Sequence, residues 1–269
     1  MYKEFYSFKE HPFNITSDPS FFFASSKHQE AFHHLQYGIE SRKGIVVITG
    51  EIGTGKTTLC RTLLNRLDKK IKTALILNPN FSDLQLLQMI IHDLGLNCPQ
   101  GNKLDLVNAL SQFLLEQSAK GNNVAVIIDE CQNLDIEQLE EIRLLSNLET
   151  EKEKLLQIIL VGQPELLEKL RDPGLRQLNQ RVAVRYHILP LEKNEVADYI
   201  RHRLTTAGAD PRLSFAPDAM HMIYDYSGGT PRLINILCDR ALLAGFVEET
   251  FTITADVIRQ SAREVLLTL

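Results

Sequence analysis

Residues 50–58 are the part of the sequence whose residue types and spacing most clearly suggest chemistry. They read Gly50-Glu51-Ile52-Gly53-Thr54-Gly55-Lys56-Thr57-Thr58, which matches the complete P-loop pattern. Glycines let backbone N–H groups turn inward around an anion, and a helix beginning after the loop adds its positive N-terminus. We expect Lys56 to reach the β- and γ-phosphates, the Thr57 hydroxyl to ligate Mg²⁺, and Thr58 to contact the α-phosphate. The loop therefore predicts a nucleoside triphosphate site, with ATP and Mg²⁺ as the expected ligands.

Two adjacent carboxylates, Asp129 and Glu130, follow a second apolar run at residues 124–128. A buried strand that ends in this pair would deliver both side chains to the phosphate-binding loop. We expect Asp129 to hold the Mg²⁺ shell and Glu130 to polarise the attacking water as a general base. The pair argues against a small-molecule kinase, in which the acceptor substrate supplies the nucleophile. The two carboxylates therefore predict that the protein hydrolyses the nucleotide as well as binding it.

Polar residues farther along the chain extend this site. Gln163 follows the apolar run 156–161, where it would sense the γ-phosphate and help to place the water; the alternative is a turn residue that caps the next helix. Phosphoryl transfer often needs a cationic finger on the developing charge. Arg181 is the first choice and Arg176 the second, and the alternative is a solvated helix face. Arg232, in the first turn of a helix opened by Pro231, would reach the phosphates if that helix folds over the nucleotide.

The elements that must position these residues alternate between strand and helix. Strands are expected at residues 44–49, 73–77, 124–128, 156–161 and 182–188, with helices at 26–42, 56–67, 84–94, 104–118 and 136–148. This alternation predicts an α/β P-loop NTPase domain with a three-layer parallel sheet. After Pro190 the strands stop, and helices at 192–205, 217–226, 231–246 and 255–266 predict a small all-helical lid domain. We therefore expect an N-terminal aromatic arm at 1–25, a nucleotide-binding domain at 26–190 and a helical domain at 191–269.

The arm and the overall composition are less specific. The aromatic residues of the arm would either seal the core of the main domain or form a wall of a ligand pocket. The eight histidines form no ligand set, and we expect none to be catalytic. A net charge of −5 disfavours nucleic acid as an obligatory partner. The N-terminus lacks a signal peptide, no apolar run is long enough for a membrane span, and the scattered cysteines favour reduced thiols in a cytoplasmic protein. These cysteines are Cys60, Cys98, Cys131 and Cys238.

Several longer motifs suggest a family. They are Phe8-Lys9-Glu10-His11-Pro12-Phe13, Asp18-Pro19-x-x-Phe22, Tyr37-Gly38-Ile39, Asp129-Glu130-x-Gln132-Asn133-Leu134 and Gly162-Gln163-Pro164-Glu165-Leu166. With the P-loop, they resemble AAA+ ATPases, and more narrowly the ExeA/GspA type (general secretion pathway protein A, MshM-like), over essentially the whole chain. This resemblance implies an ATPase that assists assembly of a secretion, pilus or surface-polysaccharide export machine at the bacterial inner membrane. It also implies a homo-oligomer, possibly a ring, in which an arginine finger from one subunit completes the next subunit's site.

The sequence departs from that family at two points. Cys131 stands where the family usually has a small residue such as alanine. ATPases of the ExeA type continue into a membrane span and a peptidoglycan-binding domain, which are absent from this sequence, so a minimal member or a trimmed motor is expected. Two alternatives stay open: a DNA-associated regulator resembling the TnsC and MuB transposition ATPases, and a slow nucleotide-gated scaffold. Salt-sensitive DNA binding would favour the first, and turnover that does not depend on Glu130 would favour the second.

Overall fold

The computed structural model describes residues 1–97 and 102–266, so Cys98 lies outside the described residues. Contacts divide the chain into two compact units. One contains Gln29–Ile52 and Leu59–Ile188, and we call it the sheet unit. The other contains Met1–His28, Gly53–Thr58 and the chain from Leu189 onward, and we call it the helical unit. The chain leaves the sheet unit between Ile188 and Leu189, next to Pro190.

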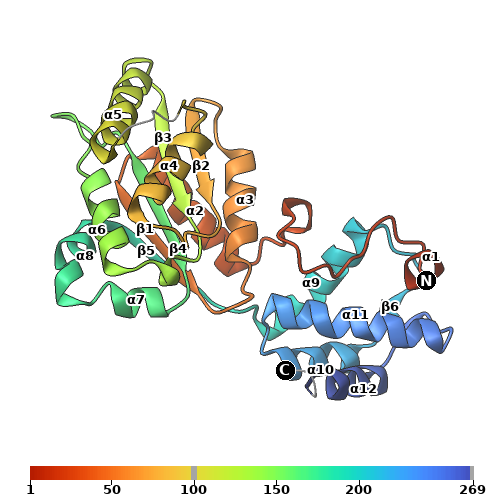
Figure 1. Ribbon diagram of the computed structural model, residues 1–269. Coiled ribbons are helices and arrows are strands. Elements are labelled where there is room, and N and C mark those ends of the chain that lie inside the picture. Colours follow the sequence, from red (N-terminus) through yellow and green to blue (C-terminus); the bar gives the residue numbers. More distant parts are fainter. Residues whose placement is uncertain (98–101, 267–269) are drawn as a thin grey trace. The chain divides into compact units, whose positions relative to one another are not determined.

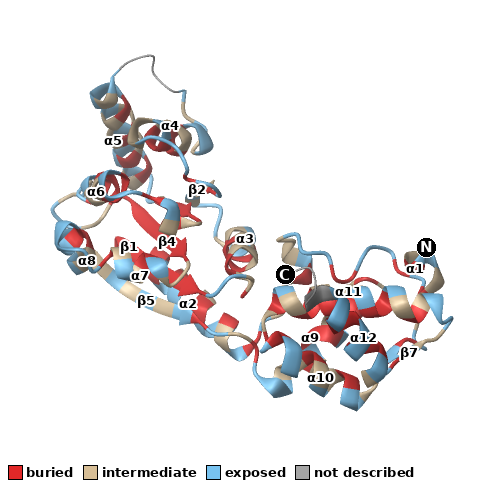
Figure 2. Ribbon diagram, turned by 60° about the horizontal axis from the view of Figure 1, so that its bottom comes forward, coloured by how far each residue is buried: buried red, intermediate tan, exposed pale blue. Residues whose placement is uncertain are grey.

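The sheet unit is built on five parallel strands in the order β2-β3-β4-β1-β5 (Figure 1). The strands are β1 (Ile45–Gly50), β2 (Ile71–Ile76), β3 (Asn123–Ile128), β4 (Gln157–Gly162) and β5 (Val182–Ile188). All residues of β1, β3 and β4 are buried, as a continuous apolar run predicts for a strand covered on both faces. The edge strand β5 instead alternates between half-buried and exposed residues up to its last residue, Ile188, which is buried (Figure 2).

Helices cover both faces of this sheet. They are α2 (Ser26–Glu40), α3 (Lys56–Arg66), α4 (Asp83–Asp93), α5 (Lys103–Ala119), α6 (Ile136–Leu145), α7 (Glu165–Lys169) and α8 (Arg176–Arg181). On one face, strand residues such as Val47 and Val126 share a core with leucines and isoleucines of α4, α5 and α6. On the other face α2 packs so closely that a Cβ on Gly38 would lie 2.4 Å from Val46 Cγ2. The predicted three-layer parallel sheet is confirmed.

The helical unit has its own core. Its helices are α9 (Lys193–Thr206), α10 (Pro217–Ser227), α11 (Pro231–Val247) and α12 (Ala255–Leu266), with a short α1 (Tyr2–Phe5) in the arm. The predicted helical C-terminal region is confirmed, but the expectation that strands stop after Pro190 is wrong. β6 (Ser214–Phe215) and β7 (Thr252–Ile253) pair in parallel. Two residues are too few for a period-2 pattern, so the sequence could not reveal this pairing.

The N-terminal arm packs within the helical unit. Its buried aromatic residues join the same core as α9, α10 and α11; they are Tyr2, Tyr6, Phe8, Phe13 and Phe21. The buried Arg203 of α9 ties the arm down, since its guanidinium donates to the carbonyl oxygens of Pro12 and Asn14 at 2.5 and 2.9 Å. The arm therefore seals the core of the helical unit, whereas the sequence left open the core of the main domain and a wall of a ligand pocket.

The cysteines and the possibility of a membrane span can be examined in the described residues. Cys60, Cys131 and Cys238 are buried, and none of the three forms a disulfide within the described part of the chain. Across residues 1–97 and 102–266, no helix has the length and apolar character needed to cross a membrane.

Candidate nucleotide-binding site

Three predicted site segments start at one edge of the sheet, because the parallel strands that lead into them end there. The P-loop begins where β1 ends at Gly50, Asp129 and Glu130 follow β3, and Gln163 follows β4 (Figure 1). The carboxyl ends of parallel strands share an edge, which is where ligands bind in open α/β sheets. Because β4 lies between β3 and β1, Gln163 follows the strand that separates the start of the P-loop from Asp129. The predicted role of Gln163 toward the γ-phosphate stays a prediction.

The P-loop itself takes a conformation that depends on its glycines. Gly53 and Gly55 have φ of +80° and +91°, a region that residues with a Cβ rarely adopt. Lys56 is the first residue of α3 and is buried, while Thr57 and Thr58 follow in the first turn and are half-buried. Glu51 and Ile52 are exposed. The loop and helix therefore have the arrangement in which backbone N–H groups bind phosphate.

Two groups of the helical unit hold the outer side of the loop. The backbone N–H of Arg232, in the first turn of α11, donates to the Gly53 carbonyl oxygen at 3.2 Å. A Cβ on Gly53 would lie 2.5 Å from the Cβ of Arg232, so the two residues are in close contact. The His28 Nε2 lies 2.8 Å from the Thr54 carbonyl oxygen. The structure thus places the backbone of Arg232 against the P-loop, and the exposed side chain of Arg232 extends from this contact.

The carboxylates form a hydrogen-bonded cluster with a glutamine that the sequence did not single out as a site residue. The buried Asp129 carboxylate accepts the Glu130 N–H at 2.9 Å, and Glu130 has a left-handed φ of 54°. Gln132 donates from Nε2 to Glu130 Oε2 at 2.5 Å and accepts the Gln163 N–H on Oε1 at 3.0 Å. Gln132 therefore links the predicted general base to the end of β4. Its place in the Asp-Glu-x-Gln motif was a signal, but its partners were not readable from the sequence.

Cys131 sits within this cluster without taking part in polar chemistry. Its thiol is fully buried and donates to the Ile128 carbonyl oxygen at 3.0 Å. Burial raises the pKa of this thiol well above its usual value, so it stays protonated at neutral pH. The cysteine acts as a small apolar residue.

The two candidate finger arginines lie elsewhere in the sheet unit. Arg176 begins α8 and is exposed, and Arg181 ends α8 directly before β5. Val182 pairs with Ile45, the first residue of β1, so Arg181 adjoins the amino edge of the sheet, opposite the edge where Asp129 lies. Its guanidinium donates to Ser146 Oγ at 3.3 Å and to the Asn147 side-chain oxygen. The fold therefore places Arg181 at the edge of the sheet away from the carboxylates of the same chain.

His28 is the site neighbour that the sequence analysis missed. It was expected to be non-catalytic like the other histidines, and no local pattern distinguishes it. Its imidazole is buried between Ser25 and the P-loop, with Nδ1 2.7 Å from Ser25 Oγ. Burial lowers the pKa of His28, partly offset by the hydrogen bond to Thr54 and by the charge of Glu195, so the ring is neutral at pH 7.

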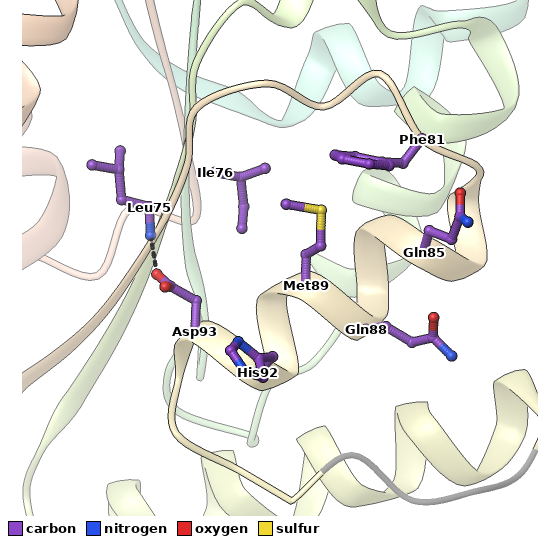
Figure 3. Close-up of a pocket in the computed structure, with 8 residues that line it drawn as sticks. All are labelled: Leu75, Ile76, Phe81, Gln85, Gln88, Met89, His92 and Asp93. Atoms are coloured by element: carbon purple, nitrogen blue, oxygen red, sulfur yellow. Dashed lines mark hydrogen bonds between the residues drawn. The ribbon is translucent and has the colours of Figure 1, made fainter.

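A separate cavity of about 430 Å³ lies along β2 and α4 (Figure 3). Phe81 and Met89 contribute apolar surface, and Asp93 accepts the backbone N–H of Leu75 at 2.6 Å. None of the predicted site residues lines this cavity. It is therefore distinct from the nucleotide site.

Comparison with known proteins supports the same family. Residues 39–170 match the family described as AAA domain. General secretion pathway protein A of Aeromonas hydrophila is 43% identical over 266 residues, which is 98% of this chain and 48% of that protein. The chain belongs to the AAA+ family and is related to general secretion pathway protein A. The predicted kinship is confirmed, and the chain spans about half the length of this curated relative.

Solved structures share the fold at low sequence identity. The ORC2 protein of Aeropyrum pernix, solved in ADPNP–ADP complexes, has a TM-score of 0.69 at 18% identity, covering 90% of this chain and 68% of that chain. Cdc6p of Pyrobaculum aerophilum has a TM-score of 0.70 at 18% identity, covering 98% of this chain and 71% of that chain. At such identities the likeness shows the fold alone.

Proposed function

We propose that this chain binds ATP with Mg²⁺ on its P-loop, hydrolyses it as a homo-oligomer, and thereby drives assembly of a bacterial secretion, pilus or surface-export machine. The observation that carries the hydrolytic part is the shared sheet edge, where β1 leads into the P-loop and β3 ends in Asp129 and Glu130. The relationship to general secretion pathway protein A supports the proposed pathway. We place the protein in the cytoplasm, at the inner membrane through its partners.

The residues fit the proposed ligands. The positive φ of Gly53 and Gly55 and the outward-held carbonyls of the loop suit a cradle of N–H groups for phosphate oxygens. Lys56 at the start of α3 adds a cation. Mg²⁺ prefers oxygen ligands, and the Thr57 hydroxyl and the Asp129 carboxylate are the groups that would hold it. The bound ion would neutralise developing charge on the phosphates.

The remaining side chains supply the hydrolytic chemistry. Glu130 accepts a proton from the attacking water, and Gln163 helps to place that water near the γ-phosphate. Gln132 holds the Glu130 carboxylate by the 2.5 Å hydrogen bond and so restricts where it points. Arg232 meets the phosphates from α11, which starts against the P-loop.

The position of Arg181, at the edge of the sheet opposite the carboxylates, supports the proposal that the protein acts as a homo-oligomer. Arg181 adjoins the amino edge, away from the carboxylates of its own chain, and Arg176 begins the helix that ends at Arg181. An arginine placed there acts as a finger only on the site of a neighbouring chain, as in phosphoryl-transfer enzymes whose arginine is supplied in trans. We therefore assign Arg181 to the neighbour's active site and Arg176 as the second candidate.

Variants of the P-loop and of the general base test this function separately. Lys56→Ala should abolish nucleotide binding, whereas Glu130→Gln should keep ATP binding and lower turnover about 100-fold or more, the range for removing a general base. Lys72→Ala, an exposed lysine on β2, is the control for loss of charge. Binding is measured by calorimetry and turnover by phosphate release. Retained affinity in Lys56→Ala contradicts the site, and normal turnover in Glu130→Gln favours the nucleotide-gated scaffold.

The partner is tested with the Glu130→Gln protein trapped with ATP. A pull-down from native bacterial membranes should recover inner-membrane secretion or pilus proteins. The same protein is incubated with DNA at low and high salt. Salt-sensitive DNA binding without recovery of membrane partners would instead favour the transposition-type regulator.

A further inference from the structure

Two consecutive backbone carbonyl groups of the P-loop point away from the loop, toward hydrogen-bond donors of Arg232 and His28. The Gly53 oxygen accepts the Arg232 N–H at 3.2 Å, and the Thr54 oxygen lies 2.8 Å from His28 Nε2. All four residues belong to the helical unit. The outer side of the loop is therefore fixed by one backbone donor and one side-chain donor.

The orientation of these carbonyls sets the orientation of two N–H groups. A trans peptide is planar, with its C=O and N–H on opposite sides, and the chain has no cis peptide among the described residues. The Gly53 carbonyl shares a peptide with the Thr54 N–H, and the Thr54 carbonyl shares one with the Gly55 N–H. Holding both carbonyls outward thus turns the Thr54 and Gly55 N–H groups inward. Successive inward N–H groups are what makes an anion-binding nest.

The hydrogen-bond partners of His28 decide which of its two ring nitrogens carries the hydrogen. The Thr54 carbonyl only accepts, so Nε2 must bear the hydrogen of a neutral ring. Nδ1 is then the acceptor, and the Ser25 hydroxyl at 2.7 Å donates to it. Both side chains are buried, at 4% and 3% exposed, and the Phe22 ring meets the imidazole edge-on at 5.8 Å between centroids. The ring is therefore held in one tautomer and one orientation.

We propose that His28 is a positioning residue for phosphate binding, which holds the Thr54–Gly55 peptide so that the Gly55 N–H faces the phosphates of the nucleotide. This role rests on the proposed nucleotide-binding function and extends it to a residue of the N-terminal part of α2. The Gly53 carbonyl is held by a backbone N–H, so no side-chain substitution removes that bond directly. His28 is the side chain through which the orientation of the loop can be tested. A Cβ at Gly55 would lie 3.2 Å from Nε2, so the ring also packs directly on the loop.

The test compares variants at position 28 that differ in where they place a donor. His28→Leu fills much of the space without a donor, His28→Gln places an N–H near the position of Nε2, and His28→Asn is too short to do so. His202→Leu, at a half-buried histidine of α9, is the matched control. Affinities for ADP and for adenosine are measured by competition against a fluorescent ADP analogue, and thermal unfolding is followed without nucleotide.

We expect His28→Leu and His28→Asn to weaken ADP binding about tenfold or more, the effect of about one hydrogen bond to a charged group, while adenosine binding changes little. His28→Gln should restore ADP affinity to within about threefold of the wild type, a difference well below one such bond. His202→Leu should leave both affinities unchanged. An equal loss for ADP and adenosine, or no rescue by His28→Gln, overturns the assignment and leaves His28 as a packing residue only.

Failure of this inference can be told apart from failure of the proposed function. If Lys56→Ala abolishes nucleotide binding while His28→Leu and His28→Asn bind ADP like the wild type, the P-loop assignment stands and the positioning role is refuted. If Lys56→Ala binds ADP normally, the proposed function itself fails. Should His28→Leu not fold, the comparison of His28→Gln with His28→Asn carries the same test, because only the reach of the donor differs between them.

Discussion

Adding one methyl group at Gly229 should destabilise the helical unit and disturb the P-loop contact that α11 makes. A Cβ at Gly229 would lie 2.0 Å from the Leu191 carbonyl oxygen and 3.0 Å from its carbonyl carbon, so backbone must move. The N–H of the same residue, Leu191, donates to the Gly229 carbonyl oxygen at 2.9 Å, and this hydrogen bond would be lost. The residue also has a φ of +77°, which is strained for any residue with a Cβ.

The magnitude follows from these contributions. The left-handed backbone costs roughly 1–2 kcal/mol, the lost hydrogen bond about 1 kcal/mol, and the steric overlap roughly 1–3 kcal/mol. We therefore expect Gly229→Ala to lower the free energy of unfolding by about 4 kcal/mol, a large part of typical domain stability. Gly228→Ala is the matched control, because Gly228 has a φ of +55° and a Cβ there would lie within 4 Å of no atom of the described residues. It should show the backbone cost alone, about 1 kcal/mol.

Urea denaturation followed by far-UV circular dichroism measures both variants, since the chain has no tryptophan to report by fluorescence. The slope of the transition should stay constant if only stability changes. Because Arg232 lies in the first turn of α11, three residues after Gly229, nucleotide affinity should fall with Gly229→Ala and change little with Gly228→Ala. Equal destabilisation by the two variants would refute the argument that Leu191 approaches Gly229 too closely for a side chain.

Two further predictions concern the neighbouring chain and the effect of pH. Arg181→Ala should reduce turnover while sparing ATP binding, and mixing it with Lys56→Ala chains, which supply Arg181 to intact sites, should restore activity; wild-type turnover in Arg181→Ala would point to Arg176 or to no finger. His28 has a lowered pKa in the folded state, because its burial outweighs the raising effects of the bond to Thr54 and the charge of Glu195. The unfolded chain therefore binds the proton more tightly, and wild-type stability should fall as pH drops below the unfolded value of about 6.5, by up to about 1.4 kcal/mol per pH unit from this group. His28→Gln should lack this contribution. We therefore expect the urea midpoint of the wild type to fall more than that of His28→Gln between about pH 7 and pH 5.5. Midpoints that change in parallel would contradict the lowered pKa of His28.

Features that depend on contiguous residues were predictable. The P-loop spans nine consecutive residues, and its chemistry depends on their order. The fold class follows from apolar runs of strand length that alternate with helical periodicity. The adjacent carboxylates Asp129 and Glu130 follow a buried run, and this fixes the sheet edge at which they lie once the strands are parallel.

Features that depend on residues distant in sequence were not predictable. The sequence of the arm contains many aromatic residues but does not indicate which core they join. In the structure they join the core of the helical unit. Arg181 was identified as a residue before a strand, but its edge of the sheet relative to Asp129 depends on strand direction and order. Gln132 and Gln163 meet only because β4 pairs beside β3.

The sequence by itself determined which groups can bind phosphate and activate water, because those groups are specified by residue type and local order. The tertiary structure decided how the P-loop is held: His28, Thr54 and Arg232 come together through packing of segments far apart in the chain. A hydrogen bond between a side chain and a backbone carbonyl requires no particular residue at the carbonyl position. No sequence pattern therefore marks the Thr54 carbonyl as the partner of His28, and only the folded chain reveals it.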